Sequence, residues 1–252
     1  YGVGESAEAR APLQKTLERF HELGGTVIDT APGYRTSESV LGDLVSHLGI
    51  RDDLFLATKV DRDGGREDSV AQMRDSARRL QTETIDLMQV HSLRDWENNL
   101  PLLQELAQDG QFRYIGVTTS RSSQYAEMEK ARTRHDLDFI QVDYSLEQRE
   151  AAERLLPLAA DRGMAVMLNR TFGGGRIFEA VGSQPLPPWA GDLQITSWAQ
   201  FLLKYALSHP AATVAIPGMT KVKHIDDNFA AAQGTMPDAG QRRQMEIFFD
   251  AL

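Results

Sequence analysis

The sequence predicts an α/β fold and, within that class, a (β/α)8 barrel, also called a TIM barrel. Short apolar runs alternate with amphipathic helical patterns from one end of the chain to the other. The runs are continuously apolar, as is typical of parallel strands that are covered on both faces. Polar residues follow several successive runs, and barrel enzymes build their sites at the carboxyl ends of their strands.

Length and composition fit one domain. The chain has 252 residues, of which 41% are apolar, which is enough to bury a sizeable core. No linker of domain-separating character interrupts it, so we expect a single barrel domain over residues 1–252. Two smaller domains would also fit the length, and a doubly wound open sheet would give the same alternation of patterns.

The individual elements are read from apolar spacing and from turn residues. The first helix is expected to end at Gly24 and Gly25, a pair suited to a left-handed cap. The expected helices cover 13–23, 37–48, 69–80, 100–108, 124–134, 151–161, 197–207, 222–232 and 241–252. The expected strands cover 26–28, 54–58, 85–90, 114–117, 139–142, 165–168 and 213–216. Seven βα units are one short of a barrel, so we expect the first strand upstream of Tyr1 or otherwise missing from the visible chain.

Charge and residue usage exclude several classes of function. A net charge of −9 argues against nucleic acid and anionic membrane partners, which would want a basic surface. The absence of cysteine removes disulfides, thiolate metal sites and cysteine nucleophiles. The six histidines show no metal-ligand spacing, so we predict no metal.

Localisation is predicted to be cytoplasmic. No apolar stretch approaches the roughly 20 residues that span a bilayer, and no signal-type segment opens the chain. The start at Tyr1 leaves an exported form open, because upstream sequence is expected. Oligomeric state is not indicated by any feature of the sequence.

Four polar residues stand at or just after three consecutive strands. Lys59 closes the buried run 54–59, and Asp29 and His91 follow the runs that end at Ile28 and Val90. Tyr34 lies in the loop after Asp29. Each has an ordinary structural interpretation, as a cap, a surface residue or a core histidine, but their joint placement predicts one converging site.

These residue types suit the protonation of a developing alkoxide. A phenol is a poor acid at neutral pH, but a nearby ammonium stabilises its phenolate. Lys59 can supply that charge to Tyr34, and Asp29 is the natural counter-ion for a buried lysine. His91 can donate to a substrate oxygen. The set lacks a nucleophile with a dedicated base, so the electrons would come from a bound hydride donor.

The chain resembles the aldo-keto reductase family in motifs that run through nearly its whole length. These are 25–31 with Tyr34, Ser37-Glu38, Leu41-Gly42, 57–59, 86–91, 115–118, 141–145, and 216–218 with Asn228. The resemblance implies a barrel that reduces the carbonyl of a small molecule with NADPH, NADH being possible here. It assigns Tyr34 as general acid, Lys59 and Asp29 as its tuning pair, and His91 as the residue that orients the carbonyl.

The resemblance also implies a cofactor site, with departures from the family pattern. Thr118 and Thr119 replace the usual Ser and Asn beside the nicotinamide carboxamide, and Asn169 replaces a stacking aromatic. Arg170 would lie near the ring or the substrate, unless it is an ion-paired loop residue. Gly218 and His224 replace basic residues that hold the 2′-phosphate, while Gly174 lies in a glycine run that can be a phosphate loop or simply a flexible one. The implied cofactor set is Thr118, Thr119, Gln141, Asn169, Arg170, Phe172, Gly174, Pro217, Gly218, Thr220, His224 and Asn228.

Two other functions stay open. The first is a cofactor-binding regulatory or interaction module on the same fold. The second is a hydrolase that uses Asp29 and Glu38 and needs no cofactor. For a reductase, Trp96, Trp189 and Phe172 are candidates to line the substrate pocket, and the proline-rich insertion 179–191 is a candidate for its rim.

Overall fold

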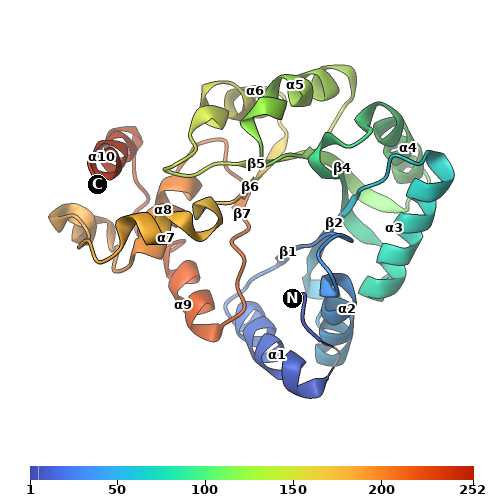
Figure 1. The fold of residues 1–252 in the computed structure, drawn as a ribbon, viewed down its shortest axis with the longest axis horizontal. Helices are drawn as coiled ribbons and strands as arrows, with labels where there is room; N and C mark the ends of the chain where they lie inside the picture. The colour runs from blue at the N-terminus through green and yellow to red at the C-terminus, as the bar shows by residue number, and fades with distance from the viewer. Residues whose placement is uncertain (5) are drawn as a thin grey trace. The chain divides into compact units, whose positions relative to one another are not determined.

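The fold alternates strands and helices along the chain, as Figure 1 shows for a computed structural model that describes residues 1–4 and 6–252. Within these residues there are seven strands. They are β1 (Val27–Asp29), β2 (Phe55–Val60), β3 (Ile85–Val90), β4 (Phe112–Thr118), β5 (Phe139–Asp143), β6 (Ala165–Asn169) and β7 (Val214–Ala215).

The α-helices lie before, between and after the strands. They are α1 (Ala7–Glu22), α2 (Ser37–Leu48), α3 (Arg66–Leu80), α4 (Trp96–Gln108), α5 (Tyr125–Arg134), α6 (Leu155–Asp161), α7 (Arg176–Val181), α8 (Trp198–Leu207), α9 (Val222–Ala230) and α10 (Ala239–Asp250). Short 3-10 helices lie at Arg51–Asp53, His91–Leu93, Ser122–Gln124, Glu150–Glu153, Gly173–Gly175 and Pro188–Leu193. None of the helices in the described residues is long and apolar enough to cross a membrane.

The chain divides into two compact units. The first contains Tyr1–Thr119, Ser123–Ile140 and Met219–Val222, and the second contains Ser120–Ser122, Gln141–Gly218 and Lys223–Leu252. In the first unit, neighbouring strands from β1 to β4 pair in parallel, and in the second β6 pairs in parallel with β7. The expectation of one domain over 1–252 stays a prediction.

Helices of the first unit pack on one another in chain order, with α1 against α2, α2 against α3 and α3 against α4. Their core contains Leu17, Val40 and Leu56, each at most 2% exposed. Gly42 lets α2 approach α3 closely, because a Cβ at this position would lie 2.1 Å from the backbone oxygen of Arg79. Glu38 and Arg79 then form an ion pair between these two helices.

Several element boundaries differ from the prediction. α1 begins at Ala7, six residues before the expected start, because Ser6 caps it by accepting a hydrogen bond from the backbone of Ala9. The expected helix over 151–161 is broken at Arg154, whose φ of −143° is not helical. The expected loop after β6 contains α7, and β2 continues past Thr58 to Val60.

The strands of the first unit place the predicted polar residues at one edge. Parallel strands have their carboxyl ends at the same edge of a sheet. Asp29 is the last residue of β1, Lys59 is the last but one of β2, and His91 directly follows β3. The fold therefore carries these side chains on three neighbouring strands of one sheet.

Candidate active site

The site is built around a buried ion pair. Lys59 is 0% exposed, and its ammonium donates hydrogen bonds to Asp29 Oδ2 at 2.6 Å and to the backbone oxygen of Thr30 at 2.7 Å. Gln89 lies opposite Lys59 in the β2–β3 register and donates to Asp29 Oδ1 at 3.1 Å. The carboxylate is therefore held at both oxygens, which fixes the position of the ammonium that it neutralises.

Tyr34 is the exposed member of the cluster. Its residue surface is 45% exposed, and the ammonium of Lys59 lies 5.2 Å from the centroid of its ring. The loop that carries it is a turn in which the Tyr34 backbone donates to the oxygen of Ala31. The Tyr34 ring therefore lies between solvent and a buried cation.

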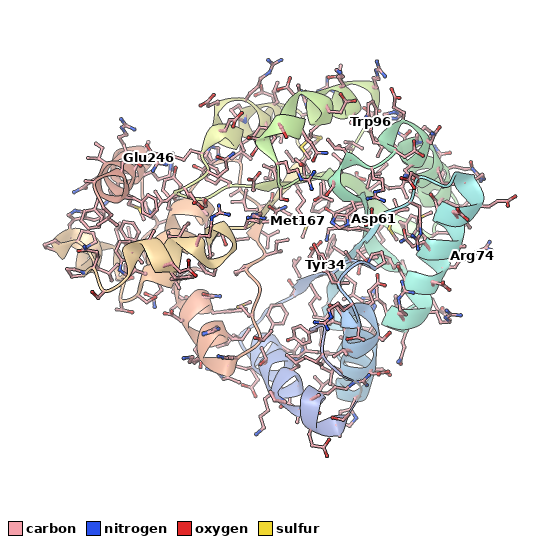
Figure 2. The ribbon with its side chains drawn as sticks, in the orientation of Figure 1. Tyr34, Asp61, Arg74, Trp96, Met167 and Glu246 are labelled. Atoms are coloured by element: carbon pink, nitrogen blue, oxygen red, sulfur yellow. The ribbon has the colours of Figure 1, made fainter. Side chains whose placement is uncertain are left out.

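His91 completes the cluster. Its ring meets the Tyr34 ring edge-on, with centroids 6.0 Å apart and planes at 87°. Burial, followed by the nearby charge of Lys59, lowers the pKa of His91, while the carboxylates of Asp61 and Asp29 oppose that shift. The structure thus brings Asp29, Tyr34, Lys59 and His91 together on the first unit (Figure 2, where Tyr34 and Asp61 are labelled).

Left-handed backbone conformations occur at the strand exits of this cluster. Arg35, directly after Tyr34, has φ of 55°, and Ser92 and Leu93, directly after His91, have φ of 52° and 55°. None of the three is glycine, and such conformations cost energy that the surrounding structure must supply. They bend the chain immediately after Tyr34 and His91.

The predicted cofactor residues divide between the two units. In the first, Thr118 and Thr119 are buried at 3% and 0% exposure, and Thr119 donates from its hydroxyl to Gln124 at 2.6 Å. Thr220 is exposed. In the second, the side chain of Asn169 at the end of β6 donates to that of Gln141 in the middle of β5 at 3.4 Å, so two amides lie side by side.

The loop after β6 is shaped by glycine. Gly173, Gly174 and Gly175 all have positive φ, and a Cβ at Gly174 would lie 3.2 Å from the guanidinium of Arg170. Arg170 makes no ion pair with another described residue, so the interpretation as an ion-paired loop residue is not supported. Phe172 packs on Phe178, with centroids 5.1 Å apart.

The remaining predicted residues follow β7. Asn228 is buried in α9 at 8% exposure, whereas His224, in the first turn of that helix, is exposed. Gly218 is exposed, and Pro217 is partly buried. The local structure places His224 where its side chain reaches solvent at the start of α9.

Three residues considered from the sequence have structural roles. Glu38, the acid of the hydrolase alternative, is 2% exposed and accepts hydrogen bonds from Thr58 and Arg79, so its carboxylate is used in packing. Trp96 is 5% exposed and donates to Glu127. Trp189 packs on Phe201 and Phe248. The roles of Trp96 and Trp189 in lining a substrate pocket stay predictions.

Sequence reasoning missed two residues of the cluster. Gln89 was an amide in the otherwise apolar run before His91, and its polarity was a usable signal. Asp61 follows Lys59 by two residues, and its carboxylate oxygen Oδ2 lies 3.4 Å from His91 Nδ1. An acid at a strand exit is the same kind of signal that identified Asp29.

Comparisons with known proteins give the family and the fold. The model of the aldo/keto reductase family matches residues 2–242. The chain is 34% identical over 168 residues to the aldo-keto reductase YhdN of Bacillus subtilis, covering 61% of this chain and 50% of that protein. The chain therefore spans only about half the length of this curated relative.

Two solved structures cover almost the whole chain. One is an aldo/keto reductase from Klebsiella pneumoniae in complex with NADP and acetate, 27% identical, with a TM-score of 0.83 over 98% of this chain and 88% of that one. The other, from the same organism in complex with NADPH, is 26% identical, with a TM-score of 0.83 over 99% and 88%. The parallel strands and this match confirm the predicted (β/α)8 fold class, and the family match over residues 2–242 shows that the chain belongs to the aldo/keto reductase family.

Proposed function

We propose that this protein reduces an aldehyde or a ketone of a small molecule to an alcohol with a reduced nicotinamide cofactor. The observation that carries the proposal is the fully buried ammonium of Lys59, neutralised by Asp29 at 2.6 Å and lying 5.2 Å from the exposed Tyr34 ring. A buried ion pair beside an exposed phenol is costly to build for stability alone. It suits an acid that must release a proton.

Tyr34 acts as the general acid in this mechanism. As the carbonyl carbon accepts a hydride, negative charge develops on its oxygen, and the Tyr34 hydroxyl donates its proton to that oxygen. The phenolate that remains is stabilised by the ammonium of Lys59, which Asp29 holds in place. His91 orients the carbonyl oxygen by a hydrogen bond from its ring. The phenolate regains its proton from solvent, which its exposure permits.

The cofactor is expected to be NADPH, with NADH possible. When bound, it supplies the hydride. The residues present fit such a group, since the adjacent amides of Gln141 and Asn169 offer donors and acceptors to a carboxamide, and the buried hydroxyl of Thr171 has no hydrogen-bond partner in the described structure. Thr118 and Thr119 would assist at the carboxamide. Relatives in complex with NADP and NADPH support this choice.

The phosphate-binding part of the cofactor site is proposed with less positive charge than the family usually has. Gly174 would admit the pyrophosphate to the backbone. Arg170 would lie near the nicotinamide ring or the substrate, and Phe172 belongs to the same cofactor set. Pro217, Gly218, Thr220 and His224 would surround the 2′-phosphate, and Asn228 would bind the adenine. Because His224 lacks the bidentate guanidinium of an arginine, we expect a smaller preference for NADPH over NADH than an arginine would give.

The experiment is a cofactor titration followed by a carbonyl panel. NADPH that binds only the folded protein raises its free energy of unfolding by about 2.7 kcal/mol at a concentration 100 times Kd. Oxidation of NADPH with aromatic aldehydes and small ketones is then measured by loss of absorbance. Stabilisation with turnover supports the proposal, and no stabilisation by either cofactor would contradict it.

The second candidate is a regulatory or interaction module that binds the cofactor without turnover. Asn169 in place of a stacking aromatic and the reduced charge near Gly218 favour this candidate. Tight NADPH binding without oxidation on any tested carbonyl, together with a stable protein partner, would select it. Cytoplasmic localisation also stays a prediction.

A further inference from the structure

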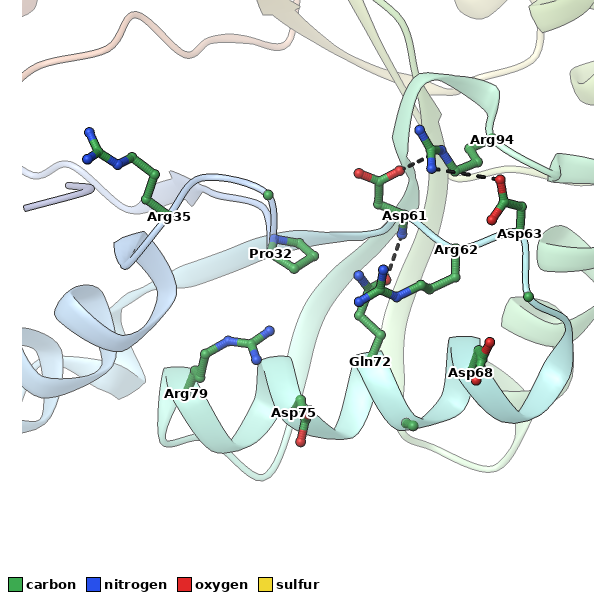
Figure 3. Close-up of a pocket in the computed structure, with 13 residues that line it drawn as sticks. Pro32, Arg35, Asp61, Arg62, Asp63, Asp68, Gln72, Asp75, Arg79 and Arg94 are labelled. Carbon is green, nitrogen blue, oxygen red and sulfur yellow. Dashed lines mark hydrogen bonds and ion pairs between the residues drawn. The ribbon is translucent and has the colours of Figure 1, made fainter.

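Asp61 is the charged residue next to His91 whose purpose the proposed mechanism does not explain. It follows β2 directly, and its backbone N–H donates to the side chain of Gln72 in α3 at 2.7 Å (Figure 3). Its carboxylate is 27% exposed and faces two partners. Oδ1 lies 2.8 Å from Arg94 Nε, and Oδ2 lies 3.4 Å from His91 Nδ1. The separation from His91 is a long contact that can shorten when substrate orders the ring.

Asp61 forms an ion pair at the edge of a pocket. The guanidinium of Arg94 contacts one carboxylate oxygen, and the residue lines a solvent-open pocket of about 620 Å³ with Arg62, Asp63 and Arg94. A carboxylate that is ionised can only accept hydrogen bonds. Nδ1 of His91 is buried without a hydrogen bond among the described residues, and Oδ2 of Asp61, 3.4 Å away, is an acceptor that a proton on this nitrogen would face.

We propose that Asp61 is a positioning residue that holds a proton on Nδ1 of His91, so that Nε2 donates to a carbonyl oxygen only when the ring is an imidazolium. In the neutral ring one nitrogen is a donor and the other an acceptor. With Nδ1 protonated, a neutral His91 offers a lone pair at Nε2, which suits the hydroxyl of an alcohol but not a carbonyl. The protonated ring suits the carbonyl.

A directional effect of pH follows, which rests on the proposed function. The groups that face His91 are Lys59, Asp61, Asp29 and the Tyr34 phenol. Carbonyl reduction should lose efficiency as pH rises through the pKa of His91, which burial and Lys59 lower and Asp61 raises. Oxidation of the alcohol should not show this loss.

Asp61→Asn is expected to reverse the direction of the hydrogen bond at His91 Nδ1 while nearly keeping the shape of the side chain. Arg94 only donates, so the amide oxygen of the new side chain is expected to face Arg94 and its NH2 to face His91. Nδ1 then becomes the acceptor, and the neutral ring carries its proton on Nε2. The matched control is Asp63→Asn in the same loop, because Asp63 lies 3.8 Å from Arg94 and is 72% exposed.

The test is long-range 1H–15N NMR of the histidine rings in the full chain without substrate, with His91 assigned by the loss of its signals in His91→Gln. The expected result is Nδ1–H in the neutral wild type and in Asp63→Asn, and Nε2–H in Asp61→Asn. A wild-type ring with Nε2–H would overturn the proposal without any variant, and an unchanged tautomer in Asp61→Asn would also overturn it.

The pH dependence of kcat/KM for carbonyl reduction is the second readout. The alkaline loss of kcat/KM is expected in the wild type and in Asp63→Asn and should be absent in Asp61→Asn. If Asp61 had only a structural role, Asp61→Asn would lower kcat/KM by the same factor at every pH. A loss that persists unchanged in Asp61→Asn would overturn the inference. If the His91 tautomer switches in Asp61→Asn as expected, but neither the wild type nor any variant reduces a carbonyl, the proposed function fails and the assignment of Asp61 stands.

Discussion

Lys59 is stabilised by a single charged partner, and that makes the pair sensitive to mutation. Both side chains are almost fully buried, at 0% and 6% exposure. Removing one partner of a buried ion pair leaves an uncompensated charge, which typically costs about 3–5 kcal/mol. We expect Lys59→Met to lower the free energy of unfolding by an amount of that order.

The prediction is checked by urea unfolding of Lys59→Met, Asp29→Asn and the double variant. Because the double variant removes both charges, we expect it to be more stable than Lys59→Met alone. Equal stability of Lys59→Met and the wild type would show that other contacts, such as the hydrogen bond from the Gln89 amide, suffice to stabilise the Asp29 carboxylate.

The sequence predicted the four proposed catalytic side chains but not what holds them. Asp29 and Lys59 stood out because charged residues rarely occupy buried strands. The contacts of Asp61 with His91 and of Glu38 with Arg79 depend on which side chains meet across strands and helices. No spacing along the chain encodes those distances, so these roles needed the structure.

At the scale of elements, the contact between α2 and α3 depends on Gly42. A Cβ there would lie 2.1 Å from the backbone oxygen of Arg79 and 2.9 Å from the carbonyl carbon of Leu80. Backbone cannot move aside as a flexible side chain can, so the helices would have to separate. We expect Gly42→Ala to destabilise the protein by about 1–3 kcal/mol, despite the higher helix propensity of alanine.

The control is Gly4→Ala, where a new Cβ would meet only the Cβ of Ala9 at 3.9 Å, an ordinary contact. Thermal unfolding of both variants gives the comparison. A Gly42→Ala protein that unfolds at or above the wild-type temperature would mean that α2 and α3 adjust without loss of packing.

Element boundaries were predictable where apolar spacing defined them and not elsewhere. Ser37–Leu48 and Ile85–Val90 were predicted with their observed bounds. The first turns of α1 contain alanine, charged residues and Pro12, which give no apolar period, so its start at Ala7 was not seen. The break at Arg154 replaces one predicted helix by a 3-10 turn and α6, and Pro157 was a usable signal for it, because proline has no N–H to donate to the carbonyl of Glu153 four residues earlier.

At the scale of the whole molecule, His209 links stability to pH. Its Nδ1 accepts a hydrogen bond from the backbone of Ala211 at 3.2 Å, and its ring packs on Tyr144. Burial, with a smaller effect of Arg242, lowers the pKa of His209. The unfolded chain therefore binds a proton more readily, near pH 6.5, than the folded chain does.

The stability that this histidine contributes is present above about pH 6.5 and is lost as pH falls through its folded pKa. We expect the free energy of unfolding of His209→Gln, measured with urea between pH 7.5 and 5, to fall less with pH than that of the wild type. His47→Gln, on the exposed face of α2, should follow the wild type. Parallel curves for His209→Gln and the wild type would contradict this assignment.

The family of the whole molecule is shown by the match over residues 2–242, whereas its chemistry rests on the cluster around Lys59. Tyr34 is the member whose proposed role is chemical and whose exposure makes it the least important for stability. Changing it to phenylalanine removes one oxygen atom and should leave the fold and cofactor binding unchanged.

The most direct test of the account is the rate of carbonyl-dependent NADPH oxidation by Tyr34→Phe at saturating cofactor. Loss of a general acid is expected to lower kcat by about 10²–10⁴-fold. Cofactor binding, measured by the rise in unfolding temperature with NADPH, should match that of the wild type. A Tyr34→Phe protein that binds the cofactor and keeps full turnover would show that the proton comes from another group.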